Sequence, residues 1–280
     1  MSGNYGGTSG GGGIYLERSS DPAHLTLKRS SLRGNSADYG GAIHNSHAPA
    51  NIVSCDFSRN TASTSGGAIY NEFAPAEITN CTFYGNNAAG TGGAFLNKNS
   101  SADGTNCTFS GNNAPSGSGF ATTGLTSSSY ITNCIFWDKG SSEIYTDAGS
   151  AKPVMEYCVV SGDITSADIS GNLRSIIHDD PLLGALTDNG GRTRTCALGD
   201  GSSAIDAGKT IDAVGADQRG VSRPQGSAYD VGTYEKEVPK SGGDDTDKST
   251  DKGDSGCSLG CAGPAGLLLL VPLAMLILKR

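Results

Sequence analysis

The chain has 280 residues, 42 of them glycine, 10 proline and 8 cysteine, and a formal net charge of −8. Glycine at about twice its average frequency excludes a helix bundle, because each glycine inside a helix costs roughly 1 kcal/mol relative to alanine. The absence of a three-residue period excludes collagen, and the acidic balance argues against nucleic acid as a partner, because phosphate binding requires clustered lysine and arginine.

A repeat of about 26 residues organises the first half of the chain. Its clearest markers are four cysteines separated by 26, 26 and 27 residues: Cys55, Cys81, Cys107 and Cys134. An aromatic residue follows each cysteine two positions later: Phe57, Phe83, Phe109 and Phe136. Because a fixed period of this size is typical of solenoids, we expect each repeat to form one coil.

The repeats contain short apolar runs separated by glycine, asparagine and serine. This pattern predicts strands of three to five residues joined by tight bends, and it lacks the 3.6-residue period of helical repeats. We therefore predict an all-β fold, a right-handed parallel β-helix with three strands per coil, over residues 1–178. Coils stacked about 4.8 Å apart would place equivalent residues in ladders.

The cysteine and phenylalanine series are predicted to form structural ladders inside the coils. The thiols are expected to stay free, because parallel Cβ vectors suit a disulfide poorly. A metal site built from these thiols is the alternative, although no histidine adjoins them. Asparagine precedes three of the cysteines, at Asn80, Asn106 and Asn133, where we expect bends with positive φ.

The repeat motif resembles that of the chlamydial-type polymorphic outer membrane proteins. The resemblance rests on Gly-Gly-Ala-(Ile/Phe) paired with Phe-x-x-Asn, as in Gly66-Gly67-Ala68-Ile69 and Phe83-Tyr84-Gly85-Asn86. It covers about residues 1–136. It implies a surface-exposed β-helical passenger, which in some members is an adhesin.

A different pattern begins after the repeats. Five blocks follow one another: Asp180-Pro181-Leu182-Leu183-Gly184, Asp188-Asn189-Gly190-Gly191-Arg192-Thr193, Ser203-Ala204-Ile205-Asp206-Ala207-Gly208, Asp217-Gln218-Arg219-Gly220 and Asp230-Val231-Gly232-Thr233-Tyr234-Glu235. They resemble the choice-of-anchor Q module, which implies a C-terminal cap over residues 179–235 and no activity. Because the open end of a solenoid exposes an unpaired sheet edge, we expect the cap to cover that end.

The last segments are a polar linker and an apolar tail. Residues 236–256 are rich in Asp, Lys, Ser and Gly, which predicts a flexible linker. Residues 257–280 are predicted to form one hydrophobic helix. Its apolar stretch, residues 262–278, is 17 residues long, the lower limit for crossing a bilayer, and Lys279-Arg280 follow.

The tail is similar to Synergistes-type C-terminal sorting signals. The similarity rests on Ser255, Gly256 and Cys257 before the apolar stretch and on the basic end. It implies recognition by a sorting protease at the C-terminus and a membrane partner for residues 262–278. A plain single-pass transmembrane anchor is the alternative.

The start of the sequence lies inside a repeat, because Met1-Ser2-Gly3-Asn4 has the phase of Phe109-Ser110-Gly111-Asn112. A cell-surface or outer-membrane location requires a signal peptide, and none precedes the repeats. We therefore expect an exported protein of which this sequence is the C-terminal piece.

Candidate catalytic groups are few. β-Helix enzymes that act on polysaccharides need paired acids on one face, or a basic residue beside calcium-binding acids. The acids of the repeats are assigned to different phases: Asp56, Glu72, Glu77 and Asp103. His44 and His47 are expected at the surface, and Asp217 with Arg219 is expected to form a structural ion pair. No catalytic, cofactor-binding or metal-ligating residue is predicted.

The sequence therefore favours a non-catalytic bacterial cell-surface protein, adhesin-like or an envelope scaffold, anchored through its C-terminal segment. Its predicted partner is a host or matrix glycan or protein, and no cofactor is predicted. The alternative is a fragment of a carbohydrate-active β-helix, either a polysaccharide lyase or a glycoside hydrolase.

Overall fold

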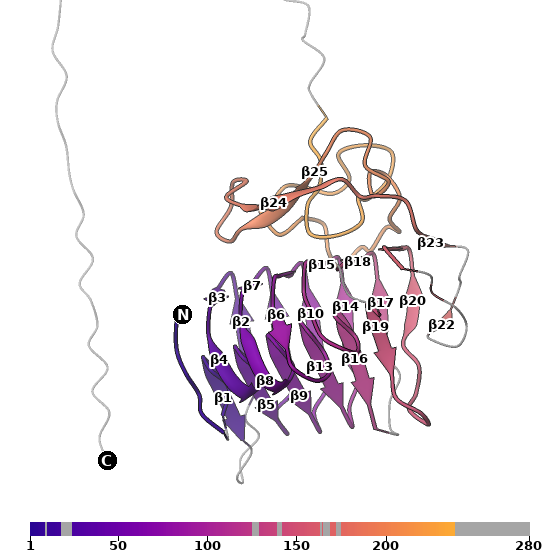
Figure 1. Ribbon diagram of the computed structural model, residues 1–280. Coiled ribbons are helices and arrows are strands. Elements are labelled where there is room, and N and C mark those ends of the chain that lie inside the picture. Colours follow the sequence, from indigo (N-terminus) through magenta and orange to yellow (C-terminus); the bar gives the residue numbers. More distant parts are fainter. Residues whose placement is uncertain are drawn as a thin grey trace, which may run out of the picture. The chain divides into compact units, whose positions relative to one another are not determined.

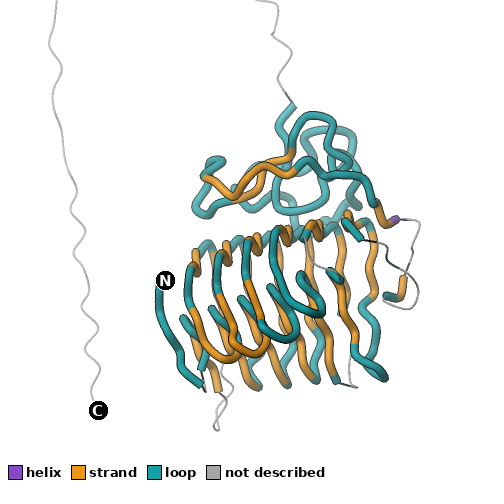
Figure 2. The backbone as a smooth tube through the Cα atoms, viewed as in Figure 1, coloured by secondary structure: helices purple, strands orange, loops and turns teal. Residues whose placement is uncertain are grey.

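The computed structural model describes residues 1–8, 10–17, 24–124, 129–138, 142–162, 164, 169–171 and 175–238. Within these residues the chain is built from strands and loops, with no α-helix (Figure 1, Figure 2). One compact unit extends from Met1 to Pro239. The predicted hydrophobic helix, most of the predicted linker, and the sorting-signal residues Ser255, Gly256 and Cys257 lie outside the described residues.

Three long parallel sheets form the solenoid. The first sheet contains β1 (Ile14–Glu17), β5 (Ile43–Ser46), β9 (Ile69–Glu72), β13 (Phe95–Lys98), β16 (Phe120–Thr123) and β19 (Ile144–Thr146). The second contains β2 (Leu25–Lys28), β6 (Ala50–Val53), β10 (Ala76–Thr79), β14 (Ala102–Thr105), β17 (Tyr130–Thr132), β20 (Val154–Glu156) and β22 (Ser170–Gly171). The third contains β3 (Ser31–Arg33), β7 (Asp56–Ser58), β11 (Thr82–Tyr84), β15 (Thr108–Ser110), β18 (Ile135–Trp137), β21 (Cys158–Val160) and β23 (Ile176–Ile177). The predicted parallel solenoid with about 26 residues per coil is confirmed.

A short fourth sheet was not expected from the repeat pattern. It consists of β4 (Ser36–Tyr39), β8 (Thr61–Ser65) and β12 (Asn87–Ala88). Its inward positions carry small residues, and Ala62, Ala88 and Ala114 form a separate buried cluster. Alanines give a weak apolar pattern, which explains why the sequence predicts only three strands per coil.

Phenylalanine fills the core beside the third sheet. Phe83 pairs in register with Phe57 and with Phe109, and Phe109 pairs with Phe136. Successive ring centroids lie 4.9, 4.7 and 4.5 Å apart with nearly parallel planes. All four side chains are buried, so burial and ring stacking both stabilise the coils.

Cysteines form a second buried line in the core. Cys55, Cys81, Cys107, Cys134 and Cys158 are all buried and free. The backbone N–H of Cys107 donates to Sγ of Cys134 over 3.3 Å, and the thiol of Cys107 donates to the carbonyl of Thr105 over 3.4 Å. Burial raises the pKa of Cys81 and of Cys134 well above the ordinary value. The thiols of Cys81 and Cys134 are therefore held in the protonated form, and all five cysteines pack in the core as small apolar groups.

An asparagine ladder marks the bend after the third sheet. Its members are Asn35, Asn60, Asn86 and Asn112. Oδ1 of Asn60, of Asn86 and of Asn112 each accepts two hydrogen bonds from the asparagine one coil earlier, one from its backbone N–H and one from its side-chain Nδ2. Asp138 ends the ladder: its Oδ1 accepts from the backbone N–H of Asn112 over 2.7 Å and from Nδ2 of Asn112 over 3.0 Å. Burial raises the pKa of Asp138 to about 8.

The cap, residues 179–235, packs along the side of the solenoid. It contains the antiparallel pair β24 (Leu183–Thr187) and β25 (Thr195–Leu198), and the rest is irregular. Figure 1 shows it lying over the row of third-sheet strands instead of beyond the last coil. Hydrogen bonds join Thr193 to the carbonyl of Ser54, and Thr233 to Thr108. The expectation that the cap covers the end of the solenoid is therefore wrong.

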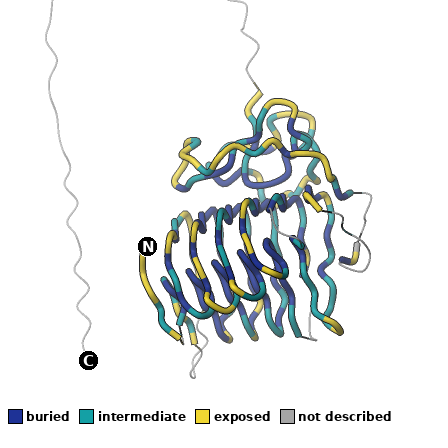
Figure 3. Tube along the Cα trace, in the orientation of Figure 1, coloured by how far each residue is buried: buried dark blue, intermediate teal, exposed yellow. Residues whose placement is uncertain are grey.

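The outward side chains of the third sheet explain this position. Thr82 and Thr108 need hydrogen-bond partners, and Ile135 and Val159 need apolar cover. The cap supplies both, because Gln218 and Thr233 bind the threonine hydroxyls, and Leu198, Ala204 and Val231 pack on the aliphatic side chains. Figure 3 shows buried residues on both sides of this contact.

Candidate functional site

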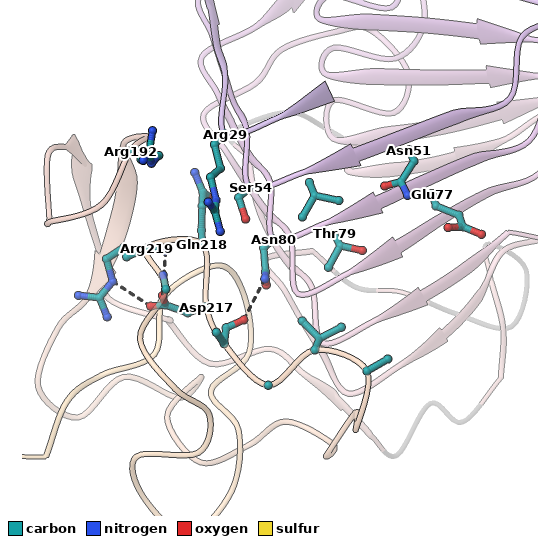
Figure 4. A pocket seen from close by; sticks show the side chains of 16 residues that line it. Arg29, Asn51, Ser54, Glu77, Thr79, Asn80, Arg192, Asp217, Gln218 and Arg219 are labelled. Carbon is teal, nitrogen blue, oxygen red and sulfur yellow. Dashed lines mark hydrogen bonds and ion pairs between the residues drawn. The ribbon is translucent and has the colours of Figure 1, made fainter. Parts of the chain in front are cut away.

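A groove of about 650 Å³ lies between the cap and the solenoid, where the second sheet turns into the third (Figure 4). The cap contributes Arg192 and the loop 213–220. The solenoid contributes side chains from three successive coils: Arg29, Asn51, Val53, Ser54, Glu77, Thr79 and Asn80. The groove therefore crosses several coils and is open to an extended ligand.

The repeat geometry determines which solenoid side chains reach the groove. Asn51 and Glu77 alternate with buried residues on β6 and β10, so they point outward. Arg29, Ser54 and Asn80 occupy equivalent bends with φ of 50°, 55° and 52°. A left-handed residue at this bend turns the chain sharply into the third sheet.

Buried polar contacts fix the cap wall of the groove. Nε2 of Gln218 donates to Oγ1 of Thr193 over 2.9 Å, and Oε1 of Gln218 accepts from Thr82 over 2.7 Å. Arg194 donates to the carboxylate of Asp56 over 2.7 Å, and Asp56 is buried. A buried charge left without its partner is costly, so this ion pair holds the cap in place.

Asp217 organises the loop at the groove. Its Oδ1 accepts from the backbone N–H groups of Arg219, Gly220 and Val221 over 2.8 to 2.9 Å. Its Oδ2 lies 2.8 Å from Nε of Arg219, which confirms the predicted ion pair. The carboxylate of Asp217 and the guanidinium of Arg219 are thus both engaged in contacts within the cap.

Two guanidinium groups at the groove remain available. Arg29 and Arg192 are exposed, and within the described part of the chain neither guanidinium group has a hydrogen-bond or ion-pair partner. Figure 4 places both near Gln218, with Asn51 and Glu77 farther along the second sheet. The groove therefore offers two unpaired guanidinium groups, with the carboxylate of Glu77 farther along it, on a chain whose net charge is −8.

Asn80 adds an unsatisfied acceptor to the same groove. Its Nδ2 donates to the carbonyl of Ala216 over 2.9 Å. Its Oδ1 is buried and has no partner among the described residues, although Asn80 lines the groove. A buried acceptor without a donor costs about 1–3 kcal/mol, so Asn80 occupies this bend at a cost in stability.

Two acids lie next to each other on the second sheet. Glu77 and Asp103 are paired in register on β10 and β14, so the expectation that they differ in phase is wrong. Their spacing of 26 residues, the repeat itself, could have revealed the pair. Oδ1 of Asp103 accepts from the backbone N–H of Tyr130 over 2.8 Å.

A histidine and tyrosine cluster covers the outer face of the first sheet. Tyr15, His44 and Tyr70 are in register on adjacent coils, and Tyr39 packs against them. The ring centroids of His44 and Tyr70 lie 5.0 Å apart. His44 is buried, so its expected surface position is wrong, whereas His47 is exposed and stacks on Phe73.

Charged groups border this cluster. Nε2 of His44 lies 3.4 Å from Oε1 of Glu72, and Nζ of Lys98 donates to the hydroxyl of Tyr70 over 3.2 Å. Burial lowers the pKa of His44, and Glu72 opposes that shift. Sequence reasoning missed this cluster, although His44 and Tyr70 are 26 residues apart, which is the length of the repeat; Tyr39 joins them from a neighbouring sheet.

The other predicted site residues lie away from the groove and from the histidine and tyrosine cluster. The ladder cysteines and phenylalanines are in the core. Among the described residues, no group of three or more His, Cys, Asp or Glu side chains could hold a metal ion. In the same part of the chain, no helix is long and apolar enough to cross a membrane.

Comparison with known proteins supports the architecture. Residues 40–178 match the family model of the right-handed β-helix region. The matched segment starts at the first full Gly-Gly-Ala motif and ends where the cap begins. No curated protein and no solved structure matches this chain.

Proposed function

We propose that this right-handed β-helix protein is a non-catalytic cell-surface protein, adhesin-like or an envelope scaffold, that holds an extended acidic glycan in its groove. The observation that carries the proposal is the pair of unpartnered guanidinium groups, Arg29 and Arg192, at one groove. The resemblance of its repeats to surface-exposed passengers supports the location.

The groove suits the chemistry of such a ligand. Guanidinium groups bind carboxylate or sulfate oxygens in a bidentate manner, and these charge-assisted hydrogen bonds are about twice as strong as neutral ones. Asn51 and Glu77 are exposed and offer acceptors for sugar hydroxyls. A polymer that carries both anionic groups and hydroxyls satisfies both sets of protein groups.

Binding of polygalacturonate measured by titration calorimetry tests the proposal. We expect the double variant Arg29→Ala/Arg192→Ala to weaken binding by about tenfold or more, and added salt to weaken wild-type binding. Arg33→Ala is the matched control, because Arg33 is also exposed and lies outside the groove. Equal affinities for the double variant and the wild type would contradict the proposal.

A second candidate function is cleavage of the same polymer. The register pair of Glu77 and Asp103 favours it, because retaining glycosidases hold two carboxyl groups about 5 Å apart and coils stack about 4.8 Å apart. Release of reducing ends from polygalacturonate, abolished by Glu77→Gln and by Asp103→Asn, would establish the enzyme. Binding without any release of ends would favour the scaffold.

We also propose that the protein is exported and anchored through its C-terminal segment, residues 257–280, which a sorting protease recognises; a plain single-pass anchor formed by residues 262–278 is the alternative. The composition of the tail supports this. Deletion of residues 257–280 from the full-length product should release the protein from the membrane fraction. A deletion variant that stays in the membrane fraction would refute the anchor.

A further inference from the structure

A second hollow, of about 700 Å³, lies on the other flank of the third sheet. The acidic-glycan groove borders the bends before β7 and β11, whereas this hollow borders the ends of β11, β15 and β18. Its solenoid side includes Tyr84, Ser110 and Trp137, and its cap side includes Asp180 and Leu182. The two sites therefore share no residue.

Two aromatic side chains line this hollow at a fixed spacing. Tyr84 pairs in register with Ser110, and Ser110 pairs with Trp137. Because each coil adds about 4.8 Å, Tyr84 and Trp137 are about 10 Å apart along the solenoid. Both are partly exposed, whereas the phenylalanines one position earlier on each strand are buried in the core.

Glycines keep the space between these aromatic residues open. Gly85 and Gly111 line the hollow and have φ of 63° and 66°. The equivalent bend one coil earlier carries Arg59 at φ 55°, so the bend itself accepts a side chain. A Cβ added to Gly111 would meet no atom within 4 Å, which shows open space at that point.

Polar groups alternate with the aromatic residues. Ser110 lies between Tyr84 and Trp137, and the exposed carboxylate of Asp180 stands on the cap side. Oδ1 of Asp180 accepts from the backbone N–H of Leu182 over 2.8 Å, which fixes the orientation of the carboxylate. No lysine or arginine is among the described residues that line the hollow, so it does not favour an anion.

We propose that this hollow binds a neutral oligosaccharide, with sugar rings stacked on Tyr84 and Trp137 and hydroxyls hydrogen-bonded to Ser110 and Asp180. Sugar rings have apolar faces and polar edges, which match partly exposed aromatic rings that alternate with polar groups. The side chains of an apolar peptide would offer no hydrogen-bond partner to Oδ2 of Asp180 or to the hydroxyl of Ser110. This site is independent of the acidic-glycan groove, since its ligand needs no negative charge.

Trp137 gives a direct test, because it is the single tryptophan of the chain. Tryptophan fluorescence and its quenching by acrylamide are measured with β-1,4-linked and α-1,4-linked glucose hexamers up to about 1 mM. We expect at least one hexamer to protect Trp137 from quenching. Tyr84→Ala should weaken this binding by about tenfold, because it removes one stacking partner.

Two further variants separate a binding defect from a folding defect. Gly111→Arg places in the hollow the side chain that Arg59 carries at the equivalent bend two coils earlier, so it should block binding while the fold is kept. Tyr130→Ala removes an exposed tyrosine from the second sheet and should leave binding unchanged. The proposal is overturned if neither hexamer protects Trp137, or if Tyr84→Ala and Gly111→Arg bind as well as the wild type does.

Discussion

Replacement of Asp138 by asparagine should stabilise the protein at neutral and alkaline pH. Asp138 occupies the last position of a ladder whose other members are asparagines, and its Oδ2 has no partner among the described residues. The amide of Asn112 donates to the carbonyl of Phe83, whereas a carboxylate at the equivalent position has no hydrogen to donate. Asparagine restores that donor and removes a buried charge.

The pKa of Asp138 gives the size and sign of the effect. It is raised from 3.8 to about 8, chiefly by burial, while the hydrogen bonds from Asn112 oppose the shift. A difference of about four units corresponds to about 6 kcal/mol at about 1.4 kcal/mol per unit. Because the folded state binds the proton more tightly, this stability is fully present below pH 3.8 and is lost as the pH rises to about 8.

Urea unfolding at pH 4, 6 and 8 tests this reasoning. The difference in unfolding free energy between Asp138→Asn and wild type should be small at pH 4 and grow to several kcal/mol at pH 8. Asn60→Asp is the converse control, because Asn60 is equally buried in the ladder and should acquire the same pH dependence. Parallel pH profiles for wild type and Asp138→Asn would refute the assignment.

Three further predictions concern stability. Phe83→Ala removes the ring stacked between Phe57 and Phe109 and should lower the unfolding free energy by about 3–5 kcal/mol; an unchanged urea midpoint would place Phe83 outside the core. Burial lowers the pKa of His44, so the unfolded state binds more protons and stability should fall as the pH drops below about 6.5. His44→Phe should flatten the dependence of the unfolding free energy on pH in that range, and an unaltered slope would argue against His44 as its source. Arg194→Ala leaves Asp56 buried without its cation and should cost about 3 kcal/mol, with the cap becoming sensitive to proteolysis; resistance equal to that of wild type would count against the ion pair as the attachment of the cap.

The sequence predicts the solenoid well because each coil repeats the same physical problem. A position that faces the core in one coil faces it in all of them, so Phe57 and Phe83 share their phase and their environment. The left-handed bends at Asn80, Asn106 and Asn133 follow for the same reason.

The position of the cap could not be predicted in this way. The cap contacts come from residues with no period, and Gln218 reaches Thr82 across 136 positions of the chain. Whether Thr82 and Ile135 face solvent or a covering segment cannot be read from their own repeats. The groove depends on that contact, so Arg29 and Arg192 are brought together only by the fold.

The most direct test of the proposed function is a crystal structure of the protein with an oligogalacturonate. We expect ligand carboxylates within hydrogen-bonding distance of Arg29 and Arg192. An oligomer bound elsewhere, for example along Tyr15 and Tyr70 of the first sheet, with an empty groove, would contradict it.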